Sequence, residues 1–301
     1  MHPFTQIPPI YDRLMSDIPY DKWVEYIEQI LKQLSCKPKK ILDLACGTGT
    51  VAFLLIKRGY KVVGVDSSEG MLNEAERKSK NEKLPLDLIH SEMQNFRLRE
   101  KVELAICLFD SLNYLLKEKD LENTFWCVFE VLTSDGIFIF DMNTEYGLSS
   151  YWGENIYVKE QSGLFSVWQN RYDQKSGIAT LRITIFAEET CPDLSVVPAC
   201  GAQPVRWLRC LPNGQDGQNG SGNGFYRRYE ELHRERAYTN EEIKELLKKA
   251  NFQDISFFKH RTFIPPTSTT TRIMVVARKG SNAKNLTKTT EALKKGDTLH
   301  Y

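Results

Sequence analysis

The chain has 301 residues, of which 41% are hydrophobic and 26% are charged, a composition ordinary for a soluble globular protein with a full hydrophobic core. The formal net charge of +1 gives no electrostatic reason to expect nucleic acid or an anionic membrane as partner, and a small substrate is the simpler expectation. No apolar run approaches the roughly 18 residues of a membrane span, and the N-terminus lacks the plan of a signal peptide. We therefore expect a cytoplasmic protein.

Aromatic residues in a polar setting open the chain. Tyr11 and Tyr20 precede a stripe of apolar residues at helical spacing between positions 23 and 34, which begins with Trp23, and Asp21 is placed to cap that helix. Two interpretations stay open. The aromatic residues form a hydrophobic lid on a sheet, or they close over a cationic cofactor, because an aromatic face attracts a cation.

A glycine-rich turn follows. The apolar strand expected over Lys40–Ala45 carries Asp43, leads into Gly47 and Gly49, and is followed at once by a helical pattern. Glycine lets a ligand lie against the backbone, and the first N–H groups of the helix face that ligand. With Ala52 the turn also satisfies the dinucleotide pattern G-x-G-x-x-A. Asp43 disfavours NAD, because a carboxylate there would repel a pyrophosphate, and it suits the ammonium group of S-adenosylmethionine.

Two further segments complete a cofactor site. An alternating strand over 61–66 ends in Asp66, and an acid at that position accepts hydrogen bonds from ribose hydroxyls. A third strand, over Leu86–Ile89, is followed by Glu92 and Met93, an acidic and an apolar residue that suit an adenine ring. Ser68 is expected to cap the helix between these strands, and Met71 in that helix either packs on the adenine or belongs to the core.

These three segments, in this order and spacing, resemble the class I S-adenosylmethionine-dependent methyltransferases. The resemblance covers about residues 11–142 and departs from the family where Glu92 replaces a common aspartate. It implies a doubly wound α/β fold with a mostly parallel, seven-stranded Rossmann-like sheet and an inserted small antiparallel β-sheet. It also implies S-adenosyl-L-methionine as cofactor, held by Tyr11, Tyr20, Trp23, Asp43, Ala45, Gly47, Gly49, Asp66, Ser67, Met71, Glu92, Met93 and Leu108.

Polar residues stand where two central strands are expected to end. The apolar strand over 102–108 is followed by Asp110, Asn113 and Tyr114, and the strand over 137–142 by Asn143. In an open parallel sheet the ligand crevice lies at the carboxyl ends of the strands, so these residues are candidates for the acceptor side. They could instead only build the turn into a helix over 121–132. The motif over 133–136 is expected to form a turn.

Alternating strands alone follow residue 146. Segments at 156–160, 165–172, 179–188 and 226–238 predict an antiparallel sheet. The resemblance implies that such an insert walls the substrate pocket or makes a homodimer contact. His233 and Arg236 on its last strand are weaker candidates for the acceptor side, because exposed charges on a sheet face explain either one alone. Residues 191–224, rich in Gly and Pro, are expected to be a flexible excursion.

The chain is expected to return to the core after residue 238. Thr239 is expected to cap a helix, and two strands are expected over 255–259 and 272–277. The resemblance implies that these two strands pair antiparallel at the sheet edge. The predicted division is a cofactor-binding core with its cap over 1–146, the inserted sheet over 147–238, the returning helix and strands over 239–279, and a disordered tail over 280–301.

The cysteines predict neither disulfides nor a metal site. The seven residues are scattered and odd in number, which argues against a disulfide framework. Three fall in predicted core elements, where they act as small hydrophobes (Cys46, Cys107, Cys127). Three others are widely spaced and lack a C-x-x-C pair (Cys191, Cys200, Cys210).

The expected activity is methyl transfer to an N or O atom of a small-molecule acceptor by in-line displacement, in which the protein aligns the partners and excludes water. An amine acceptor must be neutral to attack, and Asp110 or His233 could serve as its base. Two alternatives stay open: a regulatory or partner protein that binds the cofactor without catalysis, and an NAD-dependent dehydrogenase, which Asp43 and Glu92 disfavour.

Overall fold

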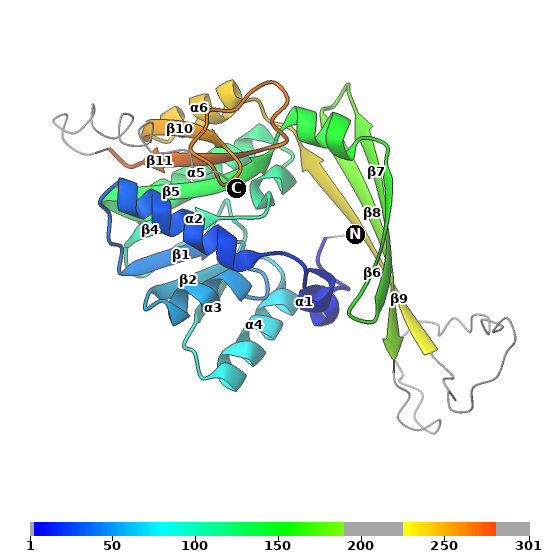
Figure 1. Cartoon of the computed structure of the whole chain (residues 1–301). Helices are drawn as coiled ribbons and strands as arrows, with labels where there is room; N and C mark the ends of the chain where they lie inside the picture. Colours follow the sequence, from blue (N-terminus) through cyan, green and yellow to red (C-terminus); the bar gives the residue numbers. More distant parts are fainter. Residues whose placement is uncertain (1–2, 190–224, 281–301) are drawn as a thin grey trace, which may run out of the picture.

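The computed structural model describes residues 3–189 and 225–280, and Figure 1 shows their arrangement. The helices of this part of the chain, including short 3₁₀ and π turns, are η1 (Pro8–Ile10), α1 (Tyr11–Leu14), α2 (Tyr20–Gln33), α3 (Thr50–Lys57), α4 (Glu69–Glu82), η2 (Ser111–Tyr114), α5 (Glu118–Val131), η3 (Gly147–Trp152) and α6 (Asn240–Lys249). The strands are β1 (Lys40–Leu44), β2 (Lys61–Asp66), β3 (Asp87–His90), β4 (Val102–Cys107), β5 (Leu132–Asn143), β6 (Ile156–Gln161), β7 (Leu164–Asp173), β8 (Ile178–Glu189), β9 (Phe225–Arg236), β10 (Gln253–Lys259) and β11 (Arg272–Arg278).

Seven strands form one sheet in the order β10-β11-β5-β4-β1-β2-β3. The pairs from β5 to β3 are parallel, and β11 pairs antiparallel with both β5 and β10. The chain order reverses between β1 and β4, so the crevice at their carboxyl ends is the expected ligand position. The predicted doubly wound α/β fold is confirmed, as is the antiparallel pairing of the last two strands.

Helices cover both faces of this sheet. Apolar residues of α2 and α3 pack on one face, and those of α5 and α6 pack on the other. The helix starts follow from local chemistry. The Ser68 side chain accepts the Met71 N–H, and Thr239 forms a reciprocal capping box with Glu242, as the sequence predicts.

Four strands form a second, antiparallel sheet in the order β6-β7-β8-β9. Figure 1 shows it standing opposite the carboxyl ends of β1 and β4, with the N-terminal segment between the two sheets. Ile7, Ile10 and Leu14 of that segment are buried together with Met71 of α4 and apolar residues of β7 and β8. The N-terminal segment therefore joins the small sheet to the cofactor half of the large one.

Two local predictions were wrong, those for Asp21 and Cys127. Asp21 does not cap α2, because the helix begins at Tyr20 after Pro19 and has no side-chain cap. The turn predicted over 133–136 is present, but inside β5: Val102 and Leu104 of β4 pair with Leu132 and Ile137, and a Cβ atom at Gly136 would lie 2.8 Å from the Leu132 Cβ. Cys46 and Cys107 are buried as expected, whereas Cys127 is only half-buried. The predicted excursion over 191–224 and the predicted tail, except Gly280, lie outside the described residues.

Candidate active site

The glycine turn occupies the carboxyl end of β1. Ala45, Gly47 and Gly49 have φ of 60°, 55° and 77°, a left-handed backbone that favours glycine. A Cβ atom built at Gly47 would meet no atom within 4 Å, so the space beside it is open. A Cβ at Gly49 would meet the Phe53 ring at 3.0 Å. The two glycines therefore differ: Gly47 borders open space, and Gly49 lets α3 pack closely.

Two carboxylates lie next to this turn. Asp66 at the end of β2 accepts the Gly47 N–H at 2.7 Å and the Ser68 N–H at 2.8 Å, one with each oxygen. Burial raises its pKa despite these hydrogen bonds. Asp43 is 3% exposed, and its Oδ2 has no hydrogen-bond partner among the described residues. Burial and then the charge of Asp66 raise the pKa of Asp43 to about 7.

The segment after β3 approaches the same carboxylate. Glu92 is exposed, and its charge contributes, after burial, to the raised pKa of Asp66. Met93 is half-buried against the core. Ser67 is exposed, and its carbonyl contacts His90 Nε2 at 2.9 Å. Asp66 and Glu92 are thus close enough to interact, and the cofactor-binding roles of Glu92 and Met93 stay predictions.

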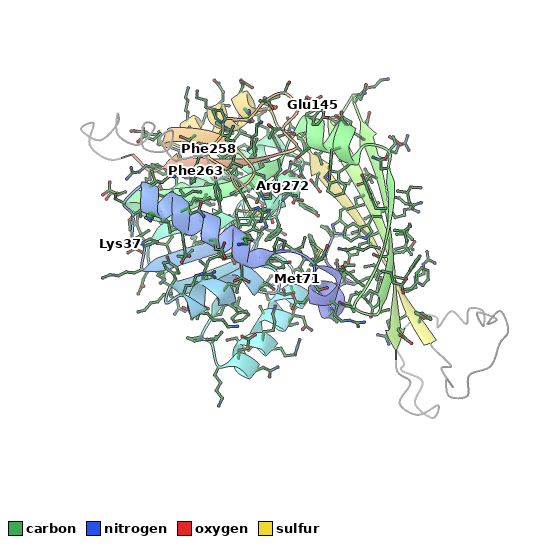
Figure 2. All side chains as sticks on the ribbon, viewed as in Figure 1. Lys37, Met71, Glu145, Phe258, Phe263 and Arg272 are labelled. Atoms are coloured by element: carbon green, nitrogen blue, oxygen red, sulfur yellow. The ribbon has the colours of Figure 1, made fainter. Side chains whose placement is uncertain are left out.

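Met71 lies elsewhere. Its side chain is 2% exposed and packs with Ile7, Ile10 and Leu14 of the N-terminal segment. Figure 2 places it on the side of α4 that faces α1. The structure therefore gives Met71 the position of a core methionine.

The N-terminal aromatic residues are divided between two places. Burial raises the pKa of Tyr11, and the next causes are Tyr20, Asp110, Asp12 and Asp66. Tyr11 is therefore within electrostatic reach of the acids at the ends of both β2 and β4, and its ring contacts Phe4 with a centroid separation of 6.0 Å.

Trp23 lies deeper, at 5% exposure. Its ring contacts Phe109 with a centroid separation of 4.4 Å and His260 at 4.4 Å, and Tyr20 contacts Phe109 at 4.9 Å. Leu108, which precedes Phe109, is also buried. Trp23 and Tyr20 thus support the end of β4, and Trp23 does not lie over the glycine turn.

A lysine that sequence reasoning missed ties α1 to the glycine turn. Lys78 of α4 donates to Asp12 at 2.8 Å and to the hydroxyls of Thr48 and Thr50 at 3.1 Å each. Thr48 in turn donates to Asp12 at 2.6 Å. This cluster fixes the position of Tyr11, which neighbours Asp12, relative to the turn.

An ion-paired arginine, also missed, organises the carboxyl end of β4. Arg272 at the start of β11 contacts Asp110 at 2.5 Å and Asp141 at 2.8 Å. Figure 2 shows Arg272 near the centre of the molecule. Phe109 and Asp110 both have positive φ, at 61° and 52°, and the Asp110 N–H donates to Asp141. A left-handed backbone is strained at the bulky Phe109, whereas Asp110 tolerates it better, and such strain is typical of functional sites.

Two asparagines join this region to the small sheet. The Asn113 amide donates to the carbonyls of Asn143 and Arg236 and accepts the Asn143 N–H. Asn113 is fully buried, and these bonds give it the position of a structural link. Asn143 donates to Glu235 at 2.8 Å. Burial and then the charge of Asp110 raise the pKa of Glu235 to about 8.

Tyr114 and His233 meet beside this pair of acids. The Tyr114 hydroxyl and His233 Nδ1 are 2.9 Å apart, and His233 is 2% exposed, so it is not the surface charge that the alternation suggested. Its Nε2 faces Glu231 at 3.5 Å. The Phe4 ring lies against both rings, at centroid separations of 4.8 Å to His233 and 5.5 Å to Tyr114.

Arg236 is not brought to the site. Its guanidinium donates to Glu242 at 3.1 Å and stacks over the Tyr238 ring at 4.4 Å. Sequence reasoning chose Arg236 and missed Glu231 and Glu235, although both lie at even spacing from His233 on one face of β9. That period of two was the pattern that could have identified them.

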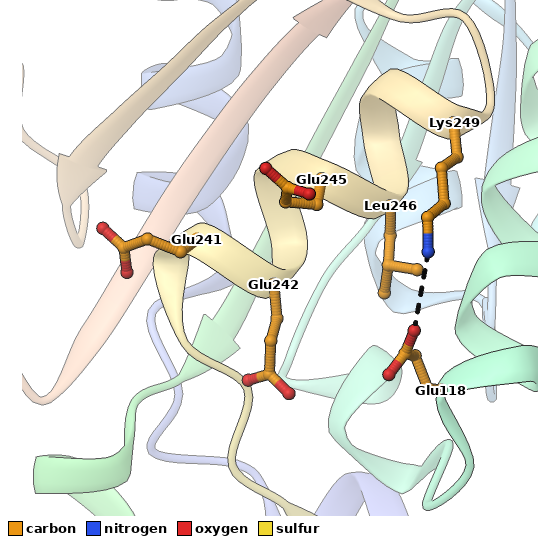
Figure 3. Close-up of a pocket in the computed structure, with 6 residues that line it drawn as sticks. All are labelled: Glu118, Glu241, Glu242, Glu245, Leu246 and Lys249. Atoms are coloured by element: carbon orange, nitrogen blue, oxygen red, sulfur yellow. Dashed lines mark ion pairs between the residues drawn. The ribbon is translucent and has the colours of Figure 1, made fainter.

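Two cavities among the described residues lie apart from these groups. One, of about 310 Å³, is an acidic concavity between α5 and α6 lined by Glu118, Glu241, Glu242, Glu245, Leu246 and Lys249 (Figure 3). Another, of about 340 Å³, lies between η3 and the loop before β11. Neither contains the glycine turn or Asp66, so the chemical grouping and not cavity size identifies the candidate site.

Residues 3–189 and 225–280 contain neither a metal-binding cluster nor a membrane-spanning helix. No cluster of three or more His, Cys, Asp or Glu side chains is placed to hold a metal ion there. No helix in that part is long and apolar enough to cross a membrane. The three cysteines considered as zinc ligands, Cys191, Cys200 and Cys210, lie outside it.

Comparison with known proteins agrees with the geometry. Residues 41–136 match a family described as a methyltransferase domain. A protein of Geobacillus sp. (strain WCH70) that is named a methyltransferase is 29% identical over 270 residues, 89% of this chain and 96% of that protein. The crystal structure of an S-adenosylmethionine-dependent methyltransferase from Clostridium acetobutylicum ATCC 824 is similar with a TM-score of 0.72 and 28% identity, over 91% of this chain and 97% of that one. A glycine/sarcosine N-methyltransferase of Aphanothece halophytica is 33% identical over 119 residues, 39% of this chain and 44% of that protein.

Proposed function

We propose that this chain, which belongs to the class I S-adenosylmethionine-dependent methyltransferases, transfers a methyl group to an N or O atom of a small-molecule acceptor. The Aphanothece halophytica enzyme, which shares 33% identity over part of the chain, is named for the methylation of a small amine. That likeness supports a small acceptor.

The observation that carries the proposal is the bonding of Asp66 beside Gly47. The carboxylate is held by two backbone N–H groups at the mouth of the glycine turn, next to open space. An ionised carboxylate has about four acceptor positions, so two remain for ribose hydroxyls. The unpartnered Asp43 Oδ2 behind the turn fits an ammonium group, or a water bound to one. The residues present therefore fit the cofactor.

Each part of the site has a proposed task. When bound, S-adenosylmethionine supplies a methyl group on a sulfonium sulfur that is already an activated leaving group. Asp43, Asp66 and Glu92 hold and orient the cofactor, and Tyr11 covers it. The side chains at the end of β4 orient the acceptor, because alignment and exclusion of water are what this displacement requires.

A second candidate is a protein that binds the cofactor but methylates nothing. One observation favours it: the Phe4 ring packs on Tyr114 and His233, so the N-terminal segment fills the acceptor side. The formation of S-adenosylhomocysteine, measured with a panel of small amines and alcohols, separates the two candidates. Turnover with any acceptor favours the enzyme, and cofactor binding with no turnover across the panel favours the second candidate.

The first test is calorimetric titration with S-adenosylmethionine, S-adenosylhomocysteine and NAD. We expect binding of the two adenosyl ligands and none of NAD. Gly47→Val should abolish that binding, because the new side chain would fill the open space beside the turn. Binding of NAD alone would contradict the assignment of Asp43.

A further inference from the structure

The acidic groups at the ends of β4, β5 and β9 exceed the cations that neutralise them. Arg272 pairs with Asp110 and Asp141. Among the described residues no cation forms an ion pair with Glu235: its partners are the Asn143 amide and the Asp110 carboxyl. Burial and then the charge of Asp110 raise the pKa of Glu235 to about 8, so Glu235 carries a proton at neutral pH. That proton lies in the hydrogen bond between the two carboxyl groups.

Two polar atoms beside this pair lack a hydrogen bond. Asp141 is fully buried, and its Oδ1 has no partner among the described residues. His233 Nε2 likewise has none, and the charge of Asp110 acts on that ring. A buried polar atom without a partner costs about 1–3 kcal/mol, and in native proteins such atoms call for an explanation such as a ligand. The unpartnered atoms are a second observation, independent of the carboxyl pair, and they point to a ligand beside that pair.

The pair also lies on the side of the site where an acceptor must bind. Asp110 follows β4, which is the neighbour of β1 in the sheet. Tyr11 lies under the influence of both Asp110 and Asp66. The Asp110–Glu235 pair therefore lies at the same end of the sheet as the proposed ribose position, and Tyr11 is within electrostatic reach of both acids, Asp110 and Asp66.

We propose that the acceptor is an amine, which enters as its ammonium ion and binds between the carboxyl groups of Asp110 and Glu235. This inference rests on the proposed function and narrows the methyl-accepting atom from nitrogen or oxygen to nitrogen. Arg272 supplies one positive charge to the carboxyl groups of Asp110 and Asp141, and an ammonium ion supplies a second beside Glu235, whereas a carboxylate or phosphate would be repelled. A neutral alcohol would bring no charge. Tyr114 and His233 line the same place.

The proton on Glu235 leaves to solvent when the ammonium ion binds. The ammonium then gives one proton back to Glu235 and becomes a neutral amine with a free lone pair. That lone pair forms the N–C bond while the C–S bond breaks, and the C–S electrons stay on sulfur. The methylated amine carries the positive charge away, and the pair keeps its proton.

The test uses a cofactor analogue that carries an amine. Sinefungin resembles S-adenosylhomocysteine but has an amine-bearing carbon in place of the sulfur, so its ammonium points to where the methyl group would be. Calorimetric titration compares sinefungin with S-adenosylhomocysteine on the wild-type protein, on Glu235→Gln, and on Glu160→Gln as control. Glu160 is an exposed glutamate on β6 of the same sheet.

We expect sinefungin to bind the wild-type protein and Glu160→Gln at least about tenfold more tightly than S-adenosylhomocysteine, which is the effect of one charge-assisted hydrogen bond. Glu235→Gln should lose that preference and keep its affinity for S-adenosylhomocysteine. Equal affinities in the wild-type protein, or a preference that survives in Glu235→Gln, would overturn the amine inference alone. No binding of either ligand by folded protein would overturn the proposed function itself.

A second measurement needs no variant. The heat of sinefungin binding to the wild-type protein, measured in buffers of different ionisation enthalpy, gives the protons released. We expect sinefungin to release about one proton more than S-adenosylhomocysteine at pH 7, because the proton on Glu235 leaves. Equal release with both ligands would contradict the proton on Glu235 and with it the amine site.

Discussion

The anchoring of the N-terminal segment on Glu231 gives a prediction that does not depend on function. The Glu231 carboxylate is 3% exposed and accepts the backbone N–H groups of Phe4, Thr5, Gln6 and Ile7 at 2.6, 2.9, 2.7 and 3.3 Å. Four consecutive backbone donors on one carboxylate fix the path of the chain between the two sheets. Glu231→Ala removes the acceptor of all four.

The size of the effect is limited by the packing of the segment. A hydrogen bond to a charged group contributes about 1.5–3 kcal/mol, but N–H groups that swing into water regain most of this. The segment would then expose the Ile7 and Ile10 side chains, each 5% exposed or less, at about 1.5–3 kcal/mol apiece. We therefore expect a loss of about 3 kcal/mol in the free energy of unfolding.

Hydrogen exchange of the four amides tests the anchor directly, with urea unfolding as the measure of stability. Glu230→Ala is the matched control, because Glu230 is the adjacent residue, pairs with Arg228 and is largely exposed. The four amides should lose protection in Glu231→Ala and keep it in Glu230→Ala. Wild-type protection of these amides in Glu231→Ala would refute the reasoning.

Three other predictions concern the charged groups. Asp66→Asn keeps one acceptor oxygen and should weaken S-adenosylmethionine binding by about 10- to 100-fold, from the loss of one charge-assisted hydrogen bond; unchanged affinity in the folded variant would contradict the ribose assignment. The pKa of Asp43 is raised to about 7, by burial and then by Asp66, so the folded state holds a proton that the unfolded chain has lost, and stability falls as pH rises from about 4 to 7. In urea unfolding the advantage of Asp43→Asn over wild type should therefore grow between pH 4 and pH 8, and a constant difference would count against the shift. Arg272→Met should cost about 3–5 kcal/mol, because Asp110 and Asp141 lose their cation, and adding Asp110→Asn should restore part of it.

The sequence predicted the core of the fold because its strong patterns are local. The alternating strand that ends in Asp66, the glycine turn and the caps at Ser68 and Thr239 each depend on residues within a few positions of each other. The cofactor side of the site follows from those segments, since the sheet brings the ends of neighbouring parallel strands together. The roles assigned to its residues, and the division of the chain at 146 and 238, stay predictions.

The acceptor side could not be predicted in the same way. Arg272 meets Asp141 across 131 positions, and Glu231 bonds Phe4 across 227. No local pattern contains such pairs. The charged residues of β9 suggested an exposed sheet face, but the N-terminal segment and Asn143 cover that face, so tertiary contacts decided the burial of His233.

The small sheet was also predicted to contact a second subunit, and this stays a prediction. Large apolar side chains are exposed on β6 and β7, among them Ile156 at 62%, Val158 at 61% and Phe165 at 40%. Ile156 and Val158 are two residues apart and lie on the same face of an edge strand. Sedimentation of the protein at several concentrations measures whether that face associates.

Four carboxyl groups with raised pKa values stand at the ends of strands around the candidate site: Asp43, Asp66, Asp141 and Glu235. In each, burial is the largest cause, so each makes the folded state less stable at neutral pH than an ordinary carboxyl would. Groups that cost stability and gather in one place are typical of functional sites. Replacement of one of these carboxyl groups by the matching amide should then stabilise the protein and impair ligand binding at the same position. The same replacement of a carboxyl group with a purely structural role would destabilise the protein.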